Sequence, residues 1–146
     1  MIKTIVVFAW NGKDQAFKHI HWDATPAFEV LLFNYSGNDA LPQMHPQAYY
    51  DELLSVSTEF KGRLMAEAYH YLKDRHQFGY IGFFDDDLEI SIAGINRLLE
   101  IAAQYNLDAF QPATTRDSFT SHAFTTQLPD TDLVLTDWVE IMCPFY

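Results

Sequence analysis

The chain has a single cysteine, Cys143, among its 146 residues. An intrachain disulfide is therefore excluded, which fits a reducing compartment, so we expect a cytoplasmic location. No apolar run reaches the roughly 20 residues that a membrane-spanning helix needs, so no membrane span is expected. The apolar run near the N-terminus is too short for a secretory signal and lacks a small-residue cleavage site, which favours a first strand.

Basic residues are also scarce, because 9 Lys and Arg stand against 20 Asp and Glu, a formal charge of −11. Nucleic acids and anionic membranes are bound by clustered Lys and Arg, so we expect neither as a partner. An anionic small molecule stays open, because a bound metal ion can reverse the local sign of the charge. Apolar residues make up 49% of the chain, enough for the core of one domain and too many for disorder.

Strand-like and helical patterns alternate, which predicts an α/β fold with a mostly parallel central sheet flanked by helices. Apolar residues at helical spacing predict helices over 59–74 and 92–105. Runs rich in β-branched and aromatic residues predict strands over 4–10, 27–35, 80–84, 108–112 and 133–142. Residues 113–132, rich in Thr and Ser, predict an irregular loop.

Both predicted helices have an expected buried face. The face of the first consists of Leu64, Met65, Ala68, Tyr69 and Leu72. That of the second consists of Ile95, Leu98, Leu99 and Ala102. Ser91 is the expected N-cap of the second helix, and Asn106 is its expected C-cap.

The most informative stretch is Asp85-Asp86-Asp87, which directly follows the predicted strand at 80–84. Ligands of open α/β sheets bind at the carboxyl ends of the strands, and adjacent carboxylates are commonly neutralised by a divalent cation. On an extended stretch Asp85 and Asp87 point the same way, so both are predicted to bind one Mn²⁺ or Mg²⁺. Asp86 then faces elsewhere and accepts hydrogen bonds. The alternative interpretation is a solvated turn whose charge favours the following helix.

Other residues are candidates for contacts to a bound nucleotide. Lys61 and Arg63, at the start of the first predicted helix, could meet a phosphate with help from the helix N-terminus, or be a solvated basic pair. Trp10 and Asn11 end the first strand, where a nucleobase could stack, although ordinary core and turn chemistry is slightly favoured. Together with Lys61, Asp85 and Asp86, these two form the predicted ligand-binding set.

Glu140 is an acid inside the apolar run Val139 to Ile141. Because acids are almost never fully buried without a partner, its side chain should reach a cleft or a partner group. A catalytic role and a structural ion pair are equally open. The six histidines show no spacing typical of a metal site.

Several segments, taken together and in order, resemble a family of uncharacterised proteins, domain of unknown function 707, with a glycosyltransferase A-type fold. They are Lys61-Gly62-Arg63, 80–88, 111–113, 118–122 and 138–145, within a match that covers roughly residues 28–146. The resemblance implies a domain that binds a nucleotide-diphospho-sugar for transfer to an unknown acceptor. It also implies that Asp85 serves the ribose or a metal-bound water, and that Asp87 coordinates the metal that holds the diphosphate. Lys61, His122 and Glu140 sit at motif positions of that family.

Members of that family continue beyond the region that matches Pro144-Phe145, with a later Gly-Leu-Asp segment and a late histidine. We therefore expect residues 1–146 to be one glycosyltransferase A-like domain that is incomplete at its C-terminus. A strand that ends there would leave apolar surface exposed, which favours self-association.

Two other functions compete with a glycosyltransferase. One is a non-catalytic module, left by truncation, that binds nucleotide or metal without turnover. The other is a phosphatase-type or receiver-type phosphotransfer domain, which also places acids at a strand end. That chemistry needs a downstream basic residue, usually a lysine, on the phosphoryl group, and this sequence has no lysine after Lys73. The phosphotransfer interpretation is therefore the weaker of the two.

Overall fold

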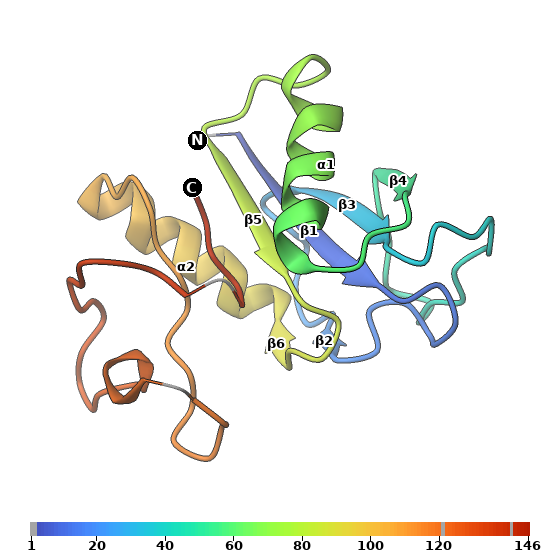
Figure 1. Ribbon diagram of the computed structural model, residues 1–146. Coiled ribbons are helices and arrows are strands. Elements are labelled where there is room, and N and C mark those ends of the chain that lie inside the picture. The colour runs from blue at the N-terminus through green and yellow to red at the C-terminus, as the bar shows by residue number, and fades with distance from the viewer. Residues whose placement is uncertain (1–2, 121, 141) are drawn as a thin grey trace.

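The computed structural model describes residues 3–120, 122–140 and 142–146. In these residues a parallel four-stranded sheet lies between two helices (Figure 1). The sheet strands are β1 (Thr4–Trp10), β3 (Glu29–Asn34), β4 (Glu52–Ser55) and β5 (Tyr80–Phe84). The helices are α1 (Lys61–Lys73) and α2 (Ile92–Tyr105). Two short strands, β2 (Ile20–His21) and β6 (Ile90–Ser91), pair with each other, and Ala123–Thr125 form a 3₁₀ turn.

The strand order, β4-β3-β1-β5, creates a switch point in the sheet. From β1 the chain builds outward through β3 to β4, and α1 then leads back to β5 on the other side of β1. In open parallel sheets, the carboxyl ends of the two strands at such a reversal border a crevice in which ligands bind. The topology therefore singles out the ends of β1 and β5.

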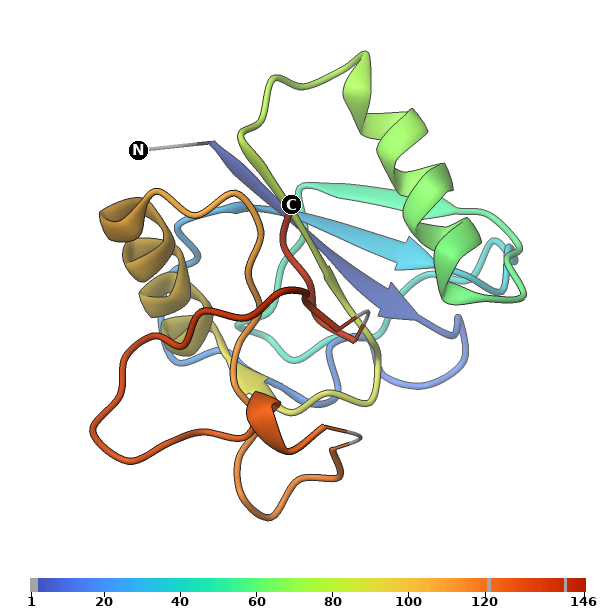
Figure 2. The same ribbon diagram turned by 60° about the vertical axis from the view of Figure 1, so that its left-hand side comes forward.

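The two faces of the sheet carry separate cores. Leu64, Ala68 and Leu72 of α1 pack on the face formed by alternate residues such as Val7 and Phe83. The opposite face, covered by α2, contains the other alternate residues of the sheet, together with Ile92, Ile95 and Ala102. Figure 2 shows the two helices on opposite sides of the sheet. Successive residues of a strand point to opposite faces, so a strand that is buried on both faces needs apolar residues at consecutive positions.

The ends of α2 lie where the sequence places them. The Ser91 side chain accepts a hydrogen bond from the Gly94 N–H at 2.9 Å, and Asn106 adopts the left-handed conformation with φ of 51°. The predicted face of α1 is partly wrong, because Tyr69 is 48% exposed and packs against the His70 ring. The buried stripe of α1 is narrow, since Leu64, Ala68 and Leu72 repeat every four residues and leave Tyr69 beside them. None of the described helices is long and apolar enough to cross a membrane.

The strand predicted over 133–142 is wrong, because the described part of this range forms no strand. Residues 144–146 take the place beside β5 instead. Ile81 exchanges both backbone hydrogen bonds with Tyr146, and the Phe83 N–H donates to the Pro144 carbonyl at 3.0 Å. The strand predicted over 108–112 is reduced to a bridge between Phe110 and Phe145. Residues 144–146 therefore cover the edge of β5 in antiparallel fashion.

Phe145 fills a space that glycine leaves open in β5. A Cβ at Gly82 would lie 2.4 Å from the Phe145 ring, closer than any ordinary carbon contact. Phe145 is completely buried and stacks on Phe110, with ring centroids 4.8 Å apart and planes 6° apart. It also meets the Phe84 ring edge-on at 5.6 Å. Gly82 thus lets the residues after Pro144 pack against the centre of the sheet.

Candidate functional site at the ends of β1 and β5

A cavity of about 160 Å³ lies where β1 and β5 end. Its wall includes Trp10 and Asn11 from the end of β1 and all three aspartates that follow β5. Residues of the loop before β2 complete it, among them Asp14, Lys18 and His19. The structure thus brings four carboxylates to one cavity at the switch point of the sheet. Such a cavity attracts cations, because adjacent carboxylates repel one another unless a positive charge lies between them.

Asp85 is held by Lys61 from the first turn of α1. The Lys61 ammonium donates to one Asp85 carboxylate oxygen and, at 3.0 Å, to the backbone carbonyl of Met142. Burial raises the pKa of the Asp85 carboxyl, and Lys61 opposes this, whereas the charges of Asp87 and Asp86 add to it. One lysine therefore ties α1, the end of β5 and the 142–146 segment together.

Asp86 and Asp87 do not continue the strand. They form a turn, closed by a 3.4 Å hydrogen bond from the Leu88 N–H to the Asp85 carbonyl. The prediction that Asp85 and Asp87 point the same way because they lie on an extended stretch is therefore wrong. Aspartate favours turns because its short side chain competes for nearby backbone groups. The turn nevertheless leaves all three aspartates on the wall of the cavity. The three aspartates therefore share a cavity for a reason other than strand alternation, and their role as ligands stays a prediction.

Asp86 accepts a 2.8 Å hydrogen bond from the Tyr35 hydroxyl, which reaches over from the end of β3. Burial and this hydrogen bond raise the pKa of the Tyr35 phenol, so the hydroxyl keeps its proton and donates. Asp87 is exposed and has no hydrogen-bond or ion-pair partner among the described residues. Of the three carboxylates, Asp87 is the one that needs no rearrangement to accept a new ligand.

Trp10 and Asn11 line the cavity but are engaged with their own loop. Trp10 is only 3% exposed, and its indole N–H donates to the Asp14 carbonyl at 2.8 Å. The Asn11 side-chain oxygen accepts from the Lys13 and Asp14 N–H groups, both at 2.9 Å, which is an Asx turn. Trp10 therefore forms the floor of the cavity, and stacking on the face of its ring would require the loop to move.

Glu140 is buried and lies outside the cavity wall. Its carboxylate is 3.7 Å from the His122 Nε2, and its backbone N–H donates to the Gln111 side-chain oxygen. The expectation that Glu140 reaches a partner is confirmed. His122 in turn meets the Trp138 ring edge-on at 4.7 Å.

Arg63 is the second basic residue considered for a phosphate. Its Nε lies 3.7 Å from a carboxylate oxygen of Glu67 within α1.

Sequence reasoning missed two residues of the site. Tyr35 was assigned to the end of a core strand, and nothing in the sequence signals that its hydroxyl crosses to Asp86. Asp14 was not among the predicted site residues, although its carboxylate accepts from the Asn11 amide at 2.9 Å and it borders the cavity. A usable signal existed for Asp14 alone, because the loop that follows the first strand of a parallel sheet often contacts the ligand.

The reactivity of the Cys143 thiol reports whether residues 142–146 stay packed on β5. It is 4% exposed, and burial raises its pKa to about 12, with Lys61 opposing and the charges of Asp85 and Glu140 adding. Because the thiolate is the reactive species, we expect alkylation of the folded protein at pH 8 to be at least about a hundredfold slower than that of a free thiol. Timed iodoacetamide labelling followed by mass spectrometry measures this rate, with the urea-unfolded chain as reference. Equal rates in the folded and unfolded chain would show that residues 142–146 do not stay on β5.

The fold and site together define an α/β domain with a parallel central sheet and an acidic cavity at its switch point, which is consistent with the Rossmann-like class. Comparisons of the chain with protein-family models, with curated proteins and with solved structures found no match. The resemblance to the domain of unknown function 707 family therefore stays a prediction.

Proposed function

We propose that this chain is the donor-binding domain of a metal-dependent glycosyltransferase. In this proposal it binds a nucleotide-diphospho-sugar together with Mn²⁺ or Mg²⁺ in the cavity at the ends of β1 and β5. The observation that carries the proposal is the convergence of Asp85, Asp86 and Asp87 with the end of β1 on one cavity. That position is where parallel α/β sheets bind nucleotides.

The donor atoms around the cavity fit a hard divalent cation. Carboxylate oxygens are the preferred ligands of Mg²⁺ and Mn²⁺. Within the described residues no group of three or more His, Cys, Asp or Glu side chains is placed to hold a metal ion by itself. Mg²⁺ commonly uses only one or two carboxylates and completes its shell with water and substrate phosphates. The site therefore fits a metal that arrives with a diphosphate rather than a permanently bound ion.

The aspartates and Lys61 would have separate roles. Asp87, exposed and without a partner among the described residues, is the proposed metal ligand. Asp85 is the second carboxylate, and it would contact the ligand while it keeps its hydrogen bond from Lys61. Asp86, oriented by Tyr35, would accept hydrogen bonds from the ligand. When bound, the metal would neutralise the diphosphate and make it a better leaving group.

Glu140 supports a second candidate function, which is binding without turnover. In the described structure its carboxylate faces His122 and does not line the cavity. A base for sugar transfer must lie within hydrogen-bond reach of the group that it deprotonates. The cavity geometry therefore favours binding, and transfer needs its own measurement.

The test is thermal unfolding of the wild-type chain with metal alone, with sugar nucleotides alone, and with both. The panel consists of uridine, guanosine, adenosine and thymidine diphosphate sugars with Mn²⁺ or Mg²⁺. We expect a rise in the melting temperature that requires metal and one nucleotide together, since a ligand at one hundred times its Kd stabilises by about 2.7 kcal/mol. No shift with any pair would refute the proposal. Release of free sugar in the same samples distinguishes turnover from binding.

A further inference from the structure

A second and larger hollow lies on the far side of the domain from β4. Its volume is about 520 Å³, within the range of roughly 300–1,000 Å³ that is usual for ligand pockets. One wall is formed by α2 and residues 107–113, and the other by residues 124–139. Figure 2 shows this second wall as a long excursion below α2, away from the four sheet strands. We call this hollow the α2 groove.

The rim of the α2 groove exposes apolar side chains. Leu135 is 81% exposed, and Val134 and Trp138 are each nearly half exposed. Phe124 packs edge-on against Trp138 at 5.0 Å and belongs to the same wall. Contiguous exposed apolar surface next to a hollow is typical of an interaction site.

The segment Leu133-Val134-Leu135-Thr136 within this wall has strand-forming residues but no strand partner. Its backbone makes no hydrogen bond to another backbone group in the described part of the chain. A segment with strong β propensity and free backbone N–H and C=O groups is a template for the addition of another strand. The position on β5 that it could have taken is already filled by residues 144–146.

The charge of the α2 groove has one sign. The charged side chains among its described lining residues are Asp132 and Asp137, and neither Lys nor Arg is present. From residue 98 onward the sequence has seven acidic side chains and one basic one, Arg116. Electrostatic complementarity then favours a positively charged occupant. A second copy of this chain is disfavoured, because each copy carries a formal charge of −11.

We propose that the α2 groove binds an extended, basic segment of another protein by strand addition. Backbone groups of the partner pair with Leu133-Val134-Leu135-Thr136, and alternate apolar side chains of the partner enter the hollow. Lys or Arg side chains near the two ends of the partner segment lie close to Asp132 and Asp137, which flank Leu133 to Thr136 in the sequence. This site is separate from the cavity at β1 and β5 and does not depend on the function proposed for that cavity.

The test uses a defined probe, a capped eight-residue peptide of alternating valine and lysine, titrated calorimetrically into the full chain. We expect binding with a Kd on the order of micromolar, accompanied by a blue shift of tryptophan emission as Trp138 becomes covered. A peptide with glutamate in place of lysine should bind at least about tenfold more weakly. A peptide with alternate N-methylated amides cannot form the ladder and should also lose binding. Binding of the N-methylated peptide with unchanged affinity would overturn strand addition.

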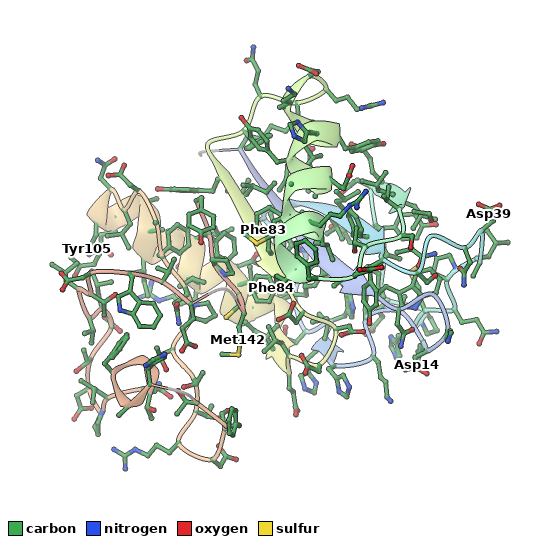
Figure 3. All side chains as sticks on the ribbon, in the orientation of Figure 1. Asp14, Asp39, Phe83, Phe84, Tyr105 and Met142 are labelled. Atoms are coloured by element: carbon green, nitrogen blue, oxygen red, sulfur yellow. The ribbon has the colours of Figure 1, made fainter. Side chains whose placement is uncertain are left out.

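Variants of the chain locate the site. Leu135→Pro removes one free N–H from an exposed position and should abolish binding, while circular dichroism should stay unchanged. Asp132→Asn with Asp137→Asn should weaken binding at least about tenfold without affecting the fold. Matched controls are Leu41→Ser, at a side chain 86% exposed outside the groove, and Asp39→Asn. Figure 3 shows Asp39 on the opposite side of the molecule from Tyr105 at the end of α2.

Two outcomes would refute the proposal. Equal binding by the wild type and by both groove variants would place the peptide elsewhere. Sedimentation showing a wild-type dimer that Leu135→Pro dissociates would identify a second copy of the chain as the occupant.

Discussion

Phe145→Ala is expected to lower the free energy of unfolding by about 3–5 kcal/mol, the usual effect of removing a buried aromatic side chain. Phe145 is 0% exposed and stacks on Phe110 while meeting Phe84 edge-on. It also lies over Gly82, where no side chain of β5 can replace it. Domains of this size are commonly stable by only about 5–15 kcal/mol, so the variant should lose a large part of its stability. Urea unfolding followed by far-UV circular dichroism measures the change.

The matched control is Phe119→Ala, because the Phe119 side chain is 89% exposed and should contribute within about 0.5 kcal/mol. Gly82→Ala should also destabilise the chain, since the new Cβ collides with the Phe145 ring. In the double variant the collision disappears, so the combined effect should be smaller than the sum of the two single effects. Additive effects, or a loss below about 1 kcal/mol for Phe145→Ala, would contradict the packing of residues 144–146 on β5.

Asp87→Asn is expected to abolish the thermal stabilisation by Mn²⁺ and nucleotide-diphospho-sugar that the wild type should show. The amide keeps the shape of the side chain but loses the negative charge that a hard cation needs. Asp87 is exposed, so the variant should keep the stability of the unliganded wild type within about 0.5 kcal/mol. Calorimetric titration with Mn²⁺ and the selected nucleotide measures the loss directly.

Two further variants show whether the loss of the ligand-induced shift is specific to Asp87. Asp39→Asn removes a carboxylate at the outer edge of the molecule and should leave the ligand-induced shift unchanged (Figure 3). Asp86→Asn disturbs the bond from Tyr35 and should weaken ligand binding without abolishing it. Full retention of the metal-dependent shift in Asp87→Asn would exclude Asp87 as the metal ligand.

Three of the four sheet strands, β1, β3 and β5, and the second helix could be predicted from local chemistry. The ends of β1 and β5 follow from β-branched and aromatic runs that stop at turn residues. Ser91 and Asn106 mark the ends of α2, because capping depends on neighbouring residues alone. The run over 133–142 has the same local preference for a strand but was predicted wrongly. A strand needs a partner, and residues 144–146 occupy the edge of β5.

The site was predictable to a similar degree. That acids after one strand meet the end of another strand follows from parallel topology, and the structure places Asp85 on the cavity wall with Asn11. Contacts between distant segments could not be predicted, such as the Tyr35 hydroxyl on Asp86 and the Lys61 ammonium on the Met142 carbonyl. These contacts depend on side-chain directions that tertiary packing fixes and that no local pattern encodes.

The pairing of residues 144–146 with β5 has a consequence for the order of folding. It joins Gly82 to Phe145 and therefore closes a loop of about sixty residues, much of it without regular structure. The contacts between β1 and β3 or within the helices span much shorter stretches of chain. Because rates fall as contacts become less local, β1 and β3 should pair before the 144–146 segment docks on β5. Until this segment docks, the space above Gly82 on β5 stays unfilled. Lys61 then keeps its contact with Asp85 but lacks its hydrogen bond to the Met142 carbonyl.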